Sequence, residues 1–388
     1  MENKKLRIAI TQGDTNGVGY EMIFKTFGKP EMLELCTPIV YGSPKVAAYH
    51  HNALGIDANF TIIHSAQEAK DGKLNLLAVN DDDVKVELGQ PTPESGAAGV
   101  KAMERAVSEA KDQLFDALVC LPLSKENAQI DSYAFPGFHS YVEQCMGDGK
   151  KVMPVYVNER TRVALATEDV PLKDVAQYIT SSLIVDKCME LNQTLHADFR
   201  ISAPRIAILA LDPADEQMQQ AAEKNIIPDA VQKLEEKQVL AFGPYQSEQI
   251  FGSTDYMHFD AILALYNDQG KAPMKALCPD YTVDFLGGMP MVITSPDVTP
   301  QFHIAGKNQA DETPLTQAVY LALDATRNRR NYNEPYANPL QKLYHEHRDE
   351  SDKTRFNVPK KDAAGKKAAP ADKKAAPADK NVQAQQGK

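Results

Sequence analysis

The chain has 388 residues, of which 43% are hydrophobic and 24% charged, and its formal net charge is −11 at pH 7. This composition is typical of a globular protein and excludes a fibrous chain or one that is disordered throughout. The stretch 359–388 carries 8 Lys and 3 Asp, so the rest of the chain is more acidic than the total suggests. Because an acidic body repels phosphate groups, we expect no nucleic-acid or anionic-membrane surface on it.

Neither a membrane span nor a signal peptide is expected. No apolar run approaches the roughly 18 residues that a spanning helix needs. The charged first residues lead into the short apolar run Leu6–Ile10, which is too short for the apolar region of a signal peptide. The five cysteines are scattered without a CxxC pair, which is typical of reduced thiols in the cytosol. We therefore expect a cytoplasmic protein.

The first part of the chain alternates short apolar runs with amphipathic stretches. In chain order, the pattern predicts a strand at 6–11, a glycine-rich turn at 13–19, a helix at 21–27, a strand at 38–41, a helix at 44–52, a helix at 96–113 and a strand at 115–120. Strands and helices in alternation indicate βαβ units and a parallel sheet.

The middle and the end of the chain continue this pattern. We predict paired short strands at 152–157 and 162–167, a helix at 172–191, a strand at 205–211, a helix at 216–237 interrupted at Pro228, a strand at 259–266 and a closing helix at 313–328. The interruption is expected because proline lacks the backbone N–H of a helix interior. The fold class predicted is therefore α/β.

Polar, Gly-rich or Pro-rich turns follow five of the predicted strands. These turns begin at Thr11, Leu121, Thr167, Asp212 and Asn267. Ligands of open α/β sheets bind just beyond the carboxyl ends of strands. We therefore expect the chemistry of this protein at these five turns.

The stretch 359–388 differs from everything before it. The heptad Lys366–Asp372 recurs once as Lys373–Asp379, and Val382 is the one branched aliphatic residue. Such a composition cannot offset the entropy of ordering the chain, so we predict a disordered, solvated tail. The alternative is a weak electrostatic contact of the tail with nucleic acid or with an acidic partner.

Three motifs at strand ends are candidates for chemistry. The turn Gly13–Gly19 is typical either of a phosphate-binding turn or of a merely tight strand-to-helix connection. Lys125 follows another strand and is either an anion contact or a surface lysine. The run Asn267–Gly270, followed by Lys275, places polar residues directly after an apolar strand and favours a functional role.

Taken together, the blocks resemble the 4-hydroxythreonine-4-phosphate dehydrogenase (PdxA) family of pyridoxal phosphate biosynthesis. They keep the family's order and spacing over about residues 6–330. The matching blocks are Ile8–Glu21, Leu121–Lys125, Phe135–Gly137, Arg162–Leu165 with Pro171–Leu172, Arg205–Pro213, Gly243–Pro244, Asp260–Lys275, Thr294–Asp297 and Ile304–Lys307.

The resemblance implies a fold, an activity and an assembly. It implies a two-domain α/β subunit of mostly parallel sheets with flanking helices, like isocitrate and isopropylmalate dehydrogenases, in a homodimer. The catalytic body would span 1–330 as two interleaved lobes with a cleft between them, followed by an extension at 331–358 and the tail at 359–388. In the family, NAD oxidises the secondary alcohol of a phosphorylated small-molecule substrate, and the product loses carbon dioxide with help from a divalent cation.

The family's three metal-binding histidines are absent at the matching positions, which hold Asp169, Ala214 and Asn267. Oxygen donors suit Mg²⁺, Mn²⁺ or Ca²⁺ better than Zn²⁺. Asp215 and Asp268 could supply further oxygen. Two alternatives follow: a rebuilt site on Asp169, Asp215 and Asn267 for a divalent cation (Mg, Mn or Zn), or no metal.

The substrate positions also differ from the family's pattern. His139 and Ser140 nearly match a substrate-binding His-Thr pair if the alignment slips by one residue. Ile293 stands where the family has a phosphate-binding arginine, and Asp284 stands where it has an asparagine. Loss of a cation removes an anion clamp.

The remaining site residues follow from the blocks that match. Lys125 and Lys275 are expected to contact the substrate, with Lys275 and Asp268 in catalysis. Cofactor contacts are expected in the region 303–312, at Asn308 and Asp311.

Three hypotheses for the function remain open at this point. The first is an NAD-dependent dehydrogenase of this family. The second is a catalytically degenerate member that acts as a binding or regulatory protein. The third is an enzyme that acts on an unphosphorylated hydroxy acid.

Overall fold

The computed structural model describes residues 5–56, 58–79, 84–129, 135–168, 170–211 and 223–337. The chain divides into two units, Met1–Ala337 and Asn338–Lys388. The second unit, which contains the predicted tail, lies outside the described residues, and everything below concerns the first. The domain boundaries proposed at residues 330 and 358 stay predictions, although a helix runs through residue 330 as far as Ala337.

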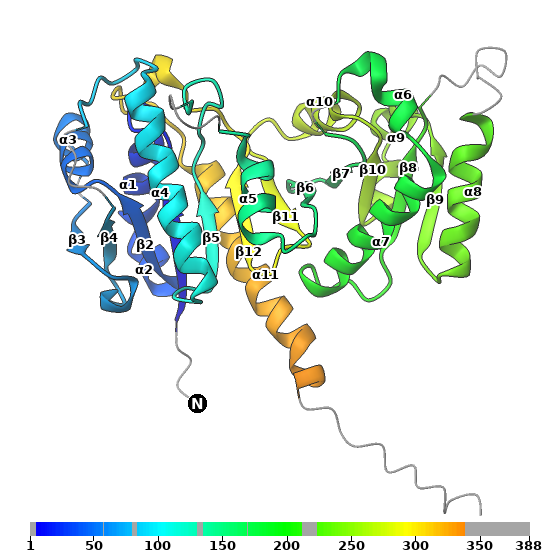
Figure 1. Ribbon diagram of the computed structural model, residues 1–388, viewed down its shortest axis with the longest axis horizontal. Helices are drawn as coiled ribbons and strands as arrows, with labels where there is room; N and C mark the ends of the chain where they lie inside the picture. The colour runs from blue at the N-terminus through cyan, green and yellow to red at the C-terminus, as the bar shows by residue number, and fades with distance from the viewer. Residues whose placement is uncertain are drawn as a thin grey trace, which may run out of the picture. The chain divides into compact units, whose positions relative to one another are not determined.

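The described residues form an α/β fold, as predicted from the sequence (Figure 1). The helices are α1 (Gly19–Phe27), α2 (Pro30–Leu35), α3 (Pro44–Leu54), α4 (Pro93–Lys111), α5 (Phe138–Met146), α6 (Val175–Tyr178), α7 (Ser181–Ala197), α8 (Glu223–Glu236), α9 (Ser247–Gly252), α10 (Asn267–Leu277) and α11 (Thr313–Ala337). The strands are β1 (Leu6–Thr11), β2 (Cys36–Gly42), β3 (Phe60–Ile63), β4 (Leu74–Ala78), β5 (Ala117–Cys120), β6 (Met153–Val157), β7 (Arg162–Leu165), β8 (Arg205–Leu209), β9 (Leu240–Tyr245), β10 (Ala261–Ala264), β11 (Val283–Gly287) and β12 (Val292–Pro296).

All of these strands join one mostly parallel sheet, in the order β3-β4-β2-β1-β5-β12-β11-β6-β7-β10-β8-β9. The pairs β12–β11, β11–β6 and β6–β7 are antiparallel, and the other pairs are parallel. Because three successive pairs are antiparallel, β7, β10, β8 and β9 at one side of the sheet run opposite to β3, β4, β2, β1, β5 and β12 at the other side. The turns that follow the strands therefore fall into two groups, one in each half of the sheet.

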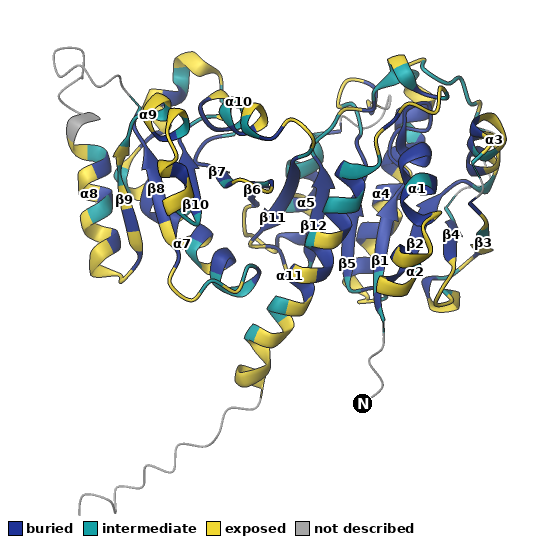
Figure 2. Ribbon diagram, turned by 180° about the vertical axis from the view of Figure 1, so that it is seen from behind, coloured by how far each residue is buried: buried dark blue, intermediate teal, exposed yellow. Residues whose placement is uncertain are grey.

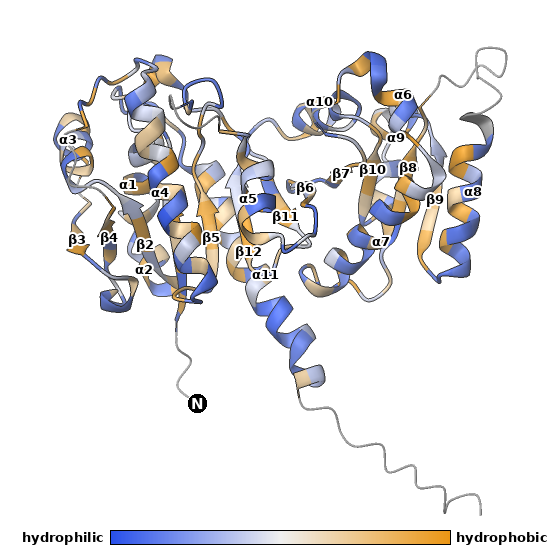
Figure 3. Cartoon of the chain, viewed as in Figure 1, coloured by the Kyte–Doolittle hydropathy of each residue, from blue (hydrophilic) through white to orange (hydrophobic). Residues whose placement is uncertain are grey.

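Helices cover both faces of the sheet because successive side chains of a buried strand point to opposite faces. Ile8 and Ile10 belong to a large apolar cluster with residues of α1, α3, α7, α8 and α11. Ala9 between them belongs to a second cluster with α4 and α5, and a third cluster lies under α9 and α10. The hydropathy colours of Figure 3 show the apolar strands of this sheet with mixed helices around them.

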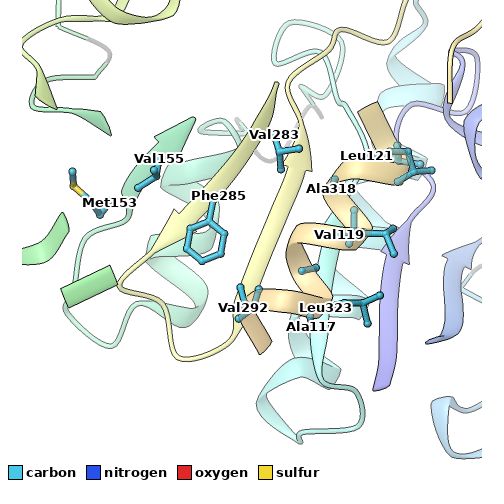
Figure 4. Packing of buried hydrophobic residues seen from close by; sticks show 14 of the residues in the cluster. Ala117, Val119, Leu121, Met153, Val155, Val283, Phe285, Val292, Ala318 and Leu323 are labelled. Carbon is cyan, nitrogen blue, oxygen red and sulfur yellow. The ribbon is translucent and has the colours of Figure 1, made fainter. Parts of the chain in front are cut away.

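The large cluster continues across the antiparallel centre of the sheet. Val119 of β5 and Phe285 of β11 belong to it together with Ala318 of α11 (Figure 4). In Figure 2 the central strands are buried, whereas exposed residues gather on the outer sides of the helices and on the edge strands β3 and β9. One core thus connects the two halves of the sheet and fixes the strand ends that carry the site.

Two predicted helices differ from the structure. The predicted helix at 172–191 is wrong as a single element, because Thr180 has an extended backbone and its side chain accepts a hydrogen bond from the Leu183 N–H, which starts α7 anew. The predicted interruption at Pro228 is also wrong, because α8 continues through this proline. The strands β3, β4, β9, β11 and β12 were not predicted.

Candidate active site

The glycine-rich turn between β1 and α1 packs against its own fold. A Cβ atom on Gly19 would lie 2.2 Å from the Gln12 carbonyl oxygen, and one on Gly17 would lie 2.7 Å from the Pro300 carbonyl oxygen. Gly13 has a positive φ of 71° and approaches the Pro122 carbonyl oxygen in the same way. These contacts explain the glycines by close backbone packing, as in a tight strand-to-helix connection.

The buried Asp14 side chain stabilises this turn through hydrogen bonds. Its carboxylate accepts hydrogen bonds from the Asn127 amide at 2.6 Å and from the Asn16 backbone N–H at 3.0 Å. Burial raises the pKa of Asp14, while these hydrogen bonds oppose the rise. Asp14 is therefore a structural anchor between the turn and the segment after β5.

The turns after β7, β8 and β10 form a second group. The Thr167 hydroxyl donates to the Leu265 carbonyl at 2.6 Å, and the buried Gln269 amide donates to the Ala210 carbonyl at 2.6 Å. Asn267 and Asp268 are exposed in the first turn of α10. Asp268 lines an open pocket of about 720 Å³ together with residues that follow β8 and β10.

A compact polar cluster lies between α5, β6, β11 and α10, and we call it the central cluster. Its members are His139, Tyr156, Glu168, Lys271, Lys275, Asp284 and Asp297. His139 stands at its centre: Nδ1 lies 2.9 Å from the Glu168 carboxylate, and Nε2 lies 2.6 Å from Oδ2 of Asp284. An imidazole with a carboxylate at each nitrogen satisfies both when it carries two N–H groups, as the imidazolium does.

Electrostatics agree with this geometry. Burial by itself would lower the pKa of His139, but the Asp284 and Glu168 carboxylates outweigh it and raise the pKa to about 11. Burial would raise the pKa of Glu168, but the hydrogen bond and charge of His139 leave it below the usual range. His139 is therefore a cation near neutral pH and does not accept a proton there.

The other side of the central cluster carries two lysines on α10. The Lys271 ammonium lies 3.9 Å from the centre of the Tyr156 ring and 3.2 Å from Oδ1 of Asp297. Lys275 lies one helical turn further and 2.9 Å from Oδ2 of Asp297. The Tyr156 hydroxyl donates to Glu168 at 3.1 Å, which links the lysine side to the histidine side.

The structure thus brings together only part of the predicted substrate site. His139, Asp284 and Lys275 belong to the central cluster. Lys125 is exposed and its side chain runs beside Gly137, just before α5. Ser140 follows His139 in α5, and its side chain makes no hydrogen bond to a described residue.

Ile293 of β12 lies in the apolar core and not in the central cluster. It is fully buried and packs in the second apolar cluster under α4 and α5. The Thr294 hydroxyl next to it donates to the Ala318 carbonyl at 3.0 Å, away from the central cluster.

The predicted cofactor residues lie apart from the central cluster, on an exposed loop before α11. Asn308 and Asp311 are exposed on this loop. Between them the buried Ala310 donates its N–H to Glu21 at 2.7 Å, and its carbonyl accepts from Lys25 at 2.7 Å. The Asn308 amide has the hydrogen-bonding groups to pair with the base of a dinucleotide, and the Asp311 carboxylate could accept hydrogen bonds from its ribose hydroxyls.

The described residues do not form a binding site for a divalent cation. Asp169 and Asp215, two of the three predicted metal ligands, lie outside the described residues. Within the described ranges, no group of three or more His, Cys, Asp and Glu side chains is arranged to hold a metal. Asn267 alone offers a neutral amide, so the metal stays a prediction.

Four members of the central cluster were missed by the sequence analysis: Tyr156, Glu168, Lys271 and Asp297. A signal existed for two of them. Asp297 follows a strand inside a matching block, and Lys271 precedes Lys275 by one helical turn. Tyr156 lies within β6, where the pattern of apolar residues predicts that a side chain is buried but not that it belongs to a site.

The comparisons identify the family to which this site belongs. Residues 34–322 match the family model described as pyridoxal phosphate biosynthetic protein PdxA. The chain belongs to the PdxA family. A Bacteroides thetaiotaomicron protein named 4-hydroxythreonine-4-phosphate dehydrogenase is 46% identical over 364 residues, which cover 93% of this chain and 100% of that protein.

Other members of the PdxA family are more distant. A Sulfurihydrogenibium protein with the same name is 34% identical and covers 82% of this chain and 98% of its own length. A crystal structure of 4-hydroxythreonine-4-phosphate dehydrogenase from Klebsiella pneumoniae superimposes with a TM-score of 0.73. It covers 84% of this chain and 99% of its own at 22% identity, so it supports the PdxA fold alone.

No helix among the described residues of this PdxA-family chain is long and apolar enough to cross a membrane.

Proposed function

We propose that this chain is an NAD-dependent dehydrogenase that oxidises 4-phosphohydroxy-L-threonine or a related hydroxy acid, with decarboxylation of the product, in pyridoxal phosphate (vitamin B6) biosynthesis or a derived pathway. The observation that carries this proposal is the 46% identity, over 93% of this chain, to a protein named for that dehydrogenase activity. A cytoplasmic homodimer is part of the proposal.

In this proposal the substrate lies against the central cluster. Lys275 and Asp268, from the first three turns of α10, are the proposed catalytic residues, and His139 and Asp284 are the proposed substrate contacts. Asn308 and Asp311 would hold NAD, which accepts a hydride from the alcohol carbon when bound. Because the described residues do not fit a divalent cation, no step is assigned to a metal.

The alternative is a catalytically degenerate member that binds or regulates. The comparisons do not favour it, because the relatives at 46% and 34% identity are both named as dehydrogenases. No contact in the described part of the chain favours it specifically.

NADH formation from 4-phosphohydroxy-L-threonine tests the proposal. We expect turnover that depends on the substrate, measured with Mg²⁺, Mn²⁺, Zn²⁺ and chelator in parallel. The variant Lys275→Ala should lower kcat/KM by about tenfold or more, since it removes a charged group at the site. Lys237→Ala, an exposed lysine at the end of α8, is the matched control. Binding of substrate without NADH formation under any of these conditions would instead support the alternative.

A further inference from the structure

The two lysines of α10 in the central cluster share a single carboxylate. The Lys271 ammonium lies 3.2 Å from Oδ1 of Asp297, and the Lys275 ammonium lies 2.9 Å from Oδ2 of the same side chain. Lys275 also donates to the Asp297 backbone carbonyl at 3.0 Å, a group without net charge. This side of the cluster therefore holds two positive charges against one negative charge.

The histidine side of the cluster has the opposite balance of charge. Glu168 and Asp284 both pair with the His139 imidazolium, at 2.9 Å and 2.6 Å, so two negative charges face one positive charge. The Tyr156 hydroxyl connects the two sides through its hydrogen bond to Glu168, but it adds no charge to either. An anionic group of a ligand is therefore attracted to the lysine side and repelled from the histidine side.

Lys271 is held against a fixed aromatic ring. Its ammonium lies 3.9 Å from the centre of the Tyr156 ring, within the range of a cation–π interaction. Tyr156 is buried, and its hydroxyl donates to Glu168 at 3.1 Å, so the ring itself is fixed in place. A cation whose position is already fixed loses less conformational entropy when it binds a ligand.

The Lys271 ammonium also has hydrogen-bonding capacity left for a ligand. An ammonium group has three N–H donors, and among the described residues the Asp297 carboxylate is the one acceptor that Lys271 meets. The side chains of Lys271 and Lys275 are 21% and 47% exposed. A ligand can therefore reach both lysines from the solvent without displacing any part of the apolar core.

A phosphate monoester matches this lysine pair better than a carboxylate does. It carries close to two negative charges at neutral pH and has three strong acceptor oxygens, so it can neutralise both lysines at once. A carboxylate carries a single charge, as Asp297 already does, and would gain little by taking the place of Asp297. Lysine is, in addition, a common phosphate ligand in proteins.

We propose that Lys271 is a specificity-determining residue, which binds, together with Lys275, the phosphate group of a phosphorylated hydroxy amino acid. Asp297 positions the two ammonium groups, and the phosphate takes up the N–H groups that Asp297 leaves free. This inference rests on the proposed function, because it concerns the substrate of the same site. Among the substrates allowed there, it favours the phosphorylated compound over an unphosphorylated hydroxy acid.

Binding of two compounds that differ only in their phosphate group tests the role of Lys271. 4-Phosphohydroxy-L-threonine and 4-hydroxy-L-threonine are titrated into the full chain by calorimetry without NAD, and NADH formation from each is measured separately with NAD. We expect the unmodified chain to bind the phosphorylated compound about tenfold more tightly or better. Lys271→Met keeps the apolar stem and removes the charge, so it should weaken binding of the phosphorylated compound by about tenfold and leave that of the other unchanged.

Lys187→Met is the matched control. Lys187 of α7 pairs with Glu190 at 3.2 Å, the same distance as between Lys271 and Asp297, and its side chain is only 12% exposed. This variant should keep both affinities. Lys271→Arg restores a cation that binds phosphate and lies well on an aromatic ring, so its affinity for the phosphorylated compound should stay within about threefold of the unmodified chain. Circular dichroism establishes that Lys271→Met is folded, and Lys271→Gln replaces it if it is not.

The outcomes separate the two proposals. Equal weakening of both compounds by Lys271→Met, or no weakening, would overturn the role of Lys271 and leave the dehydrogenase proposal standing. Tighter binding of the unphosphorylated compound by the unmodified chain would also overturn the inference. Selective weakening without NADH formation from either compound would support the inference and overturn the proposed function. If the unmodified chain binds neither compound and forms no NADH, both proposals are wrong.

Discussion

At the scale of single residues, His139 shows how two carboxylates set the state of a side chain. With Glu168 at one ring nitrogen and Asp284 at the other, the imidazole is held as a cation. Through Glu168 it connects α5 to the segment that follows β7, and through Asp284, which lies 145 residues further along the chain, it connects α5 to the start of β11. Removing it would leave two carboxylates facing each other with no cation between them.

We therefore expect His139→Gln to destabilise the fold. Breaking a buried ion pair by removing one partner costs about 3–5 kcal/mol. Partial exposure of His139 and Glu168 reduces the expected loss in the free energy of unfolding to about 1–3 kcal/mol. Urea denaturation at neutral pH measures it, with the exposed His303→Gln as control. Equal stability of the His139 and His303 variants would contradict the assigned ion pairs.

We also expect the difference in stability between the unmodified chain and His139→Gln to depend on pH. The pKa of His139 is raised to about 11 in the folded chain, against about 6.5 when unfolded. A raised pKa contributes stability that is fully present below the unfolded value and is lost as pH rises through the folded value. The stability difference between the unmodified chain and His139→Gln should be largest near pH 6 and shrink toward pH 11. A difference that grows with pH in denaturation curves would refute this sign.

At the scale of elements, the turn between β1 and α1 depends on the absence of side chains. We expect Gly19→Ala to lower the free energy of unfolding by about 2 kcal/mol or more, because its Cβ would lie 2.2 Å from the Gln12 carbonyl oxygen. Gly252→Ala in α9 is the control, since nothing lies within 4 Å of its Cβ. Thermal and urea unfolding of both variants measure the contrast, and similar losses would mean that the packing of this turn is not what requires glycine.

A second element, the loop before α11, depends on α1. Glu21 accepts from the Ala310 N–H at 2.7 Å and pairs with Lys25 at 2.9 Å. Lys29 adds an ion pair to Glu312 at 2.9 Å. These contacts fix the backbone between Asn308 and Asp311.

We expect Glu21→Gln to loosen this loop and weaken NADH binding by about three- to tenfold, which corresponds to about 1 kcal/mol. Fluorescence titration of NADH measures the affinity, and hydrogen exchange of the Ala310 amide measures the loop. The exposed Glu31→Gln in α2 should change neither. Faster exchange at Ala310 with unchanged NADH affinity would place the cofactor elsewhere.

At the scale of the whole unit, one sheet and one large core connect the two halves. Arg329 of α11 strengthens this connection through two hydrogen bonds to the buried Asp198 at the end of α7, at 2.6 Å and 2.9 Å, and a third to the Met289 carbonyl at 2.9 Å. The large apolar cluster also runs through both halves, so unfolding one half would expose apolar side chains of the other.

We therefore expect the unit Met1–Ala337 to unfold in one cooperative transition. Far-ultraviolet circular dichroism and tyrosine fluorescence should give coincident curves, and the chain contains no Trp to complicate the latter. Arg329→Ala should lower the free energy of unfolding by about 2–4 kcal/mol and keep a single transition. Two resolved transitions would show that the halves are separately stable.

Much of the fold and the family follow from the sequence alone. Buried strands such as β1 and β5 can be recognised in the sequence as apolar runs between turns. The matching sequence blocks, in their order and spacing, predict the PdxA family, and the comparisons confirm it. The composition and the order of βαβ units predict the α/β class for the same reason: local periodicity reports which face of an element is buried.

The site itself was decided by the tertiary structure. Asp284 lies at the start of β11, a strand that no periodicity revealed, and it meets His139 only because β11 pairs antiparallel between β12 and β6. Likewise, Lys271 and Asp297 meet because α10 packs beside the end of β12. Strand order and register depend on contacts between segments far apart in the chain, and a local pattern carries no information about them.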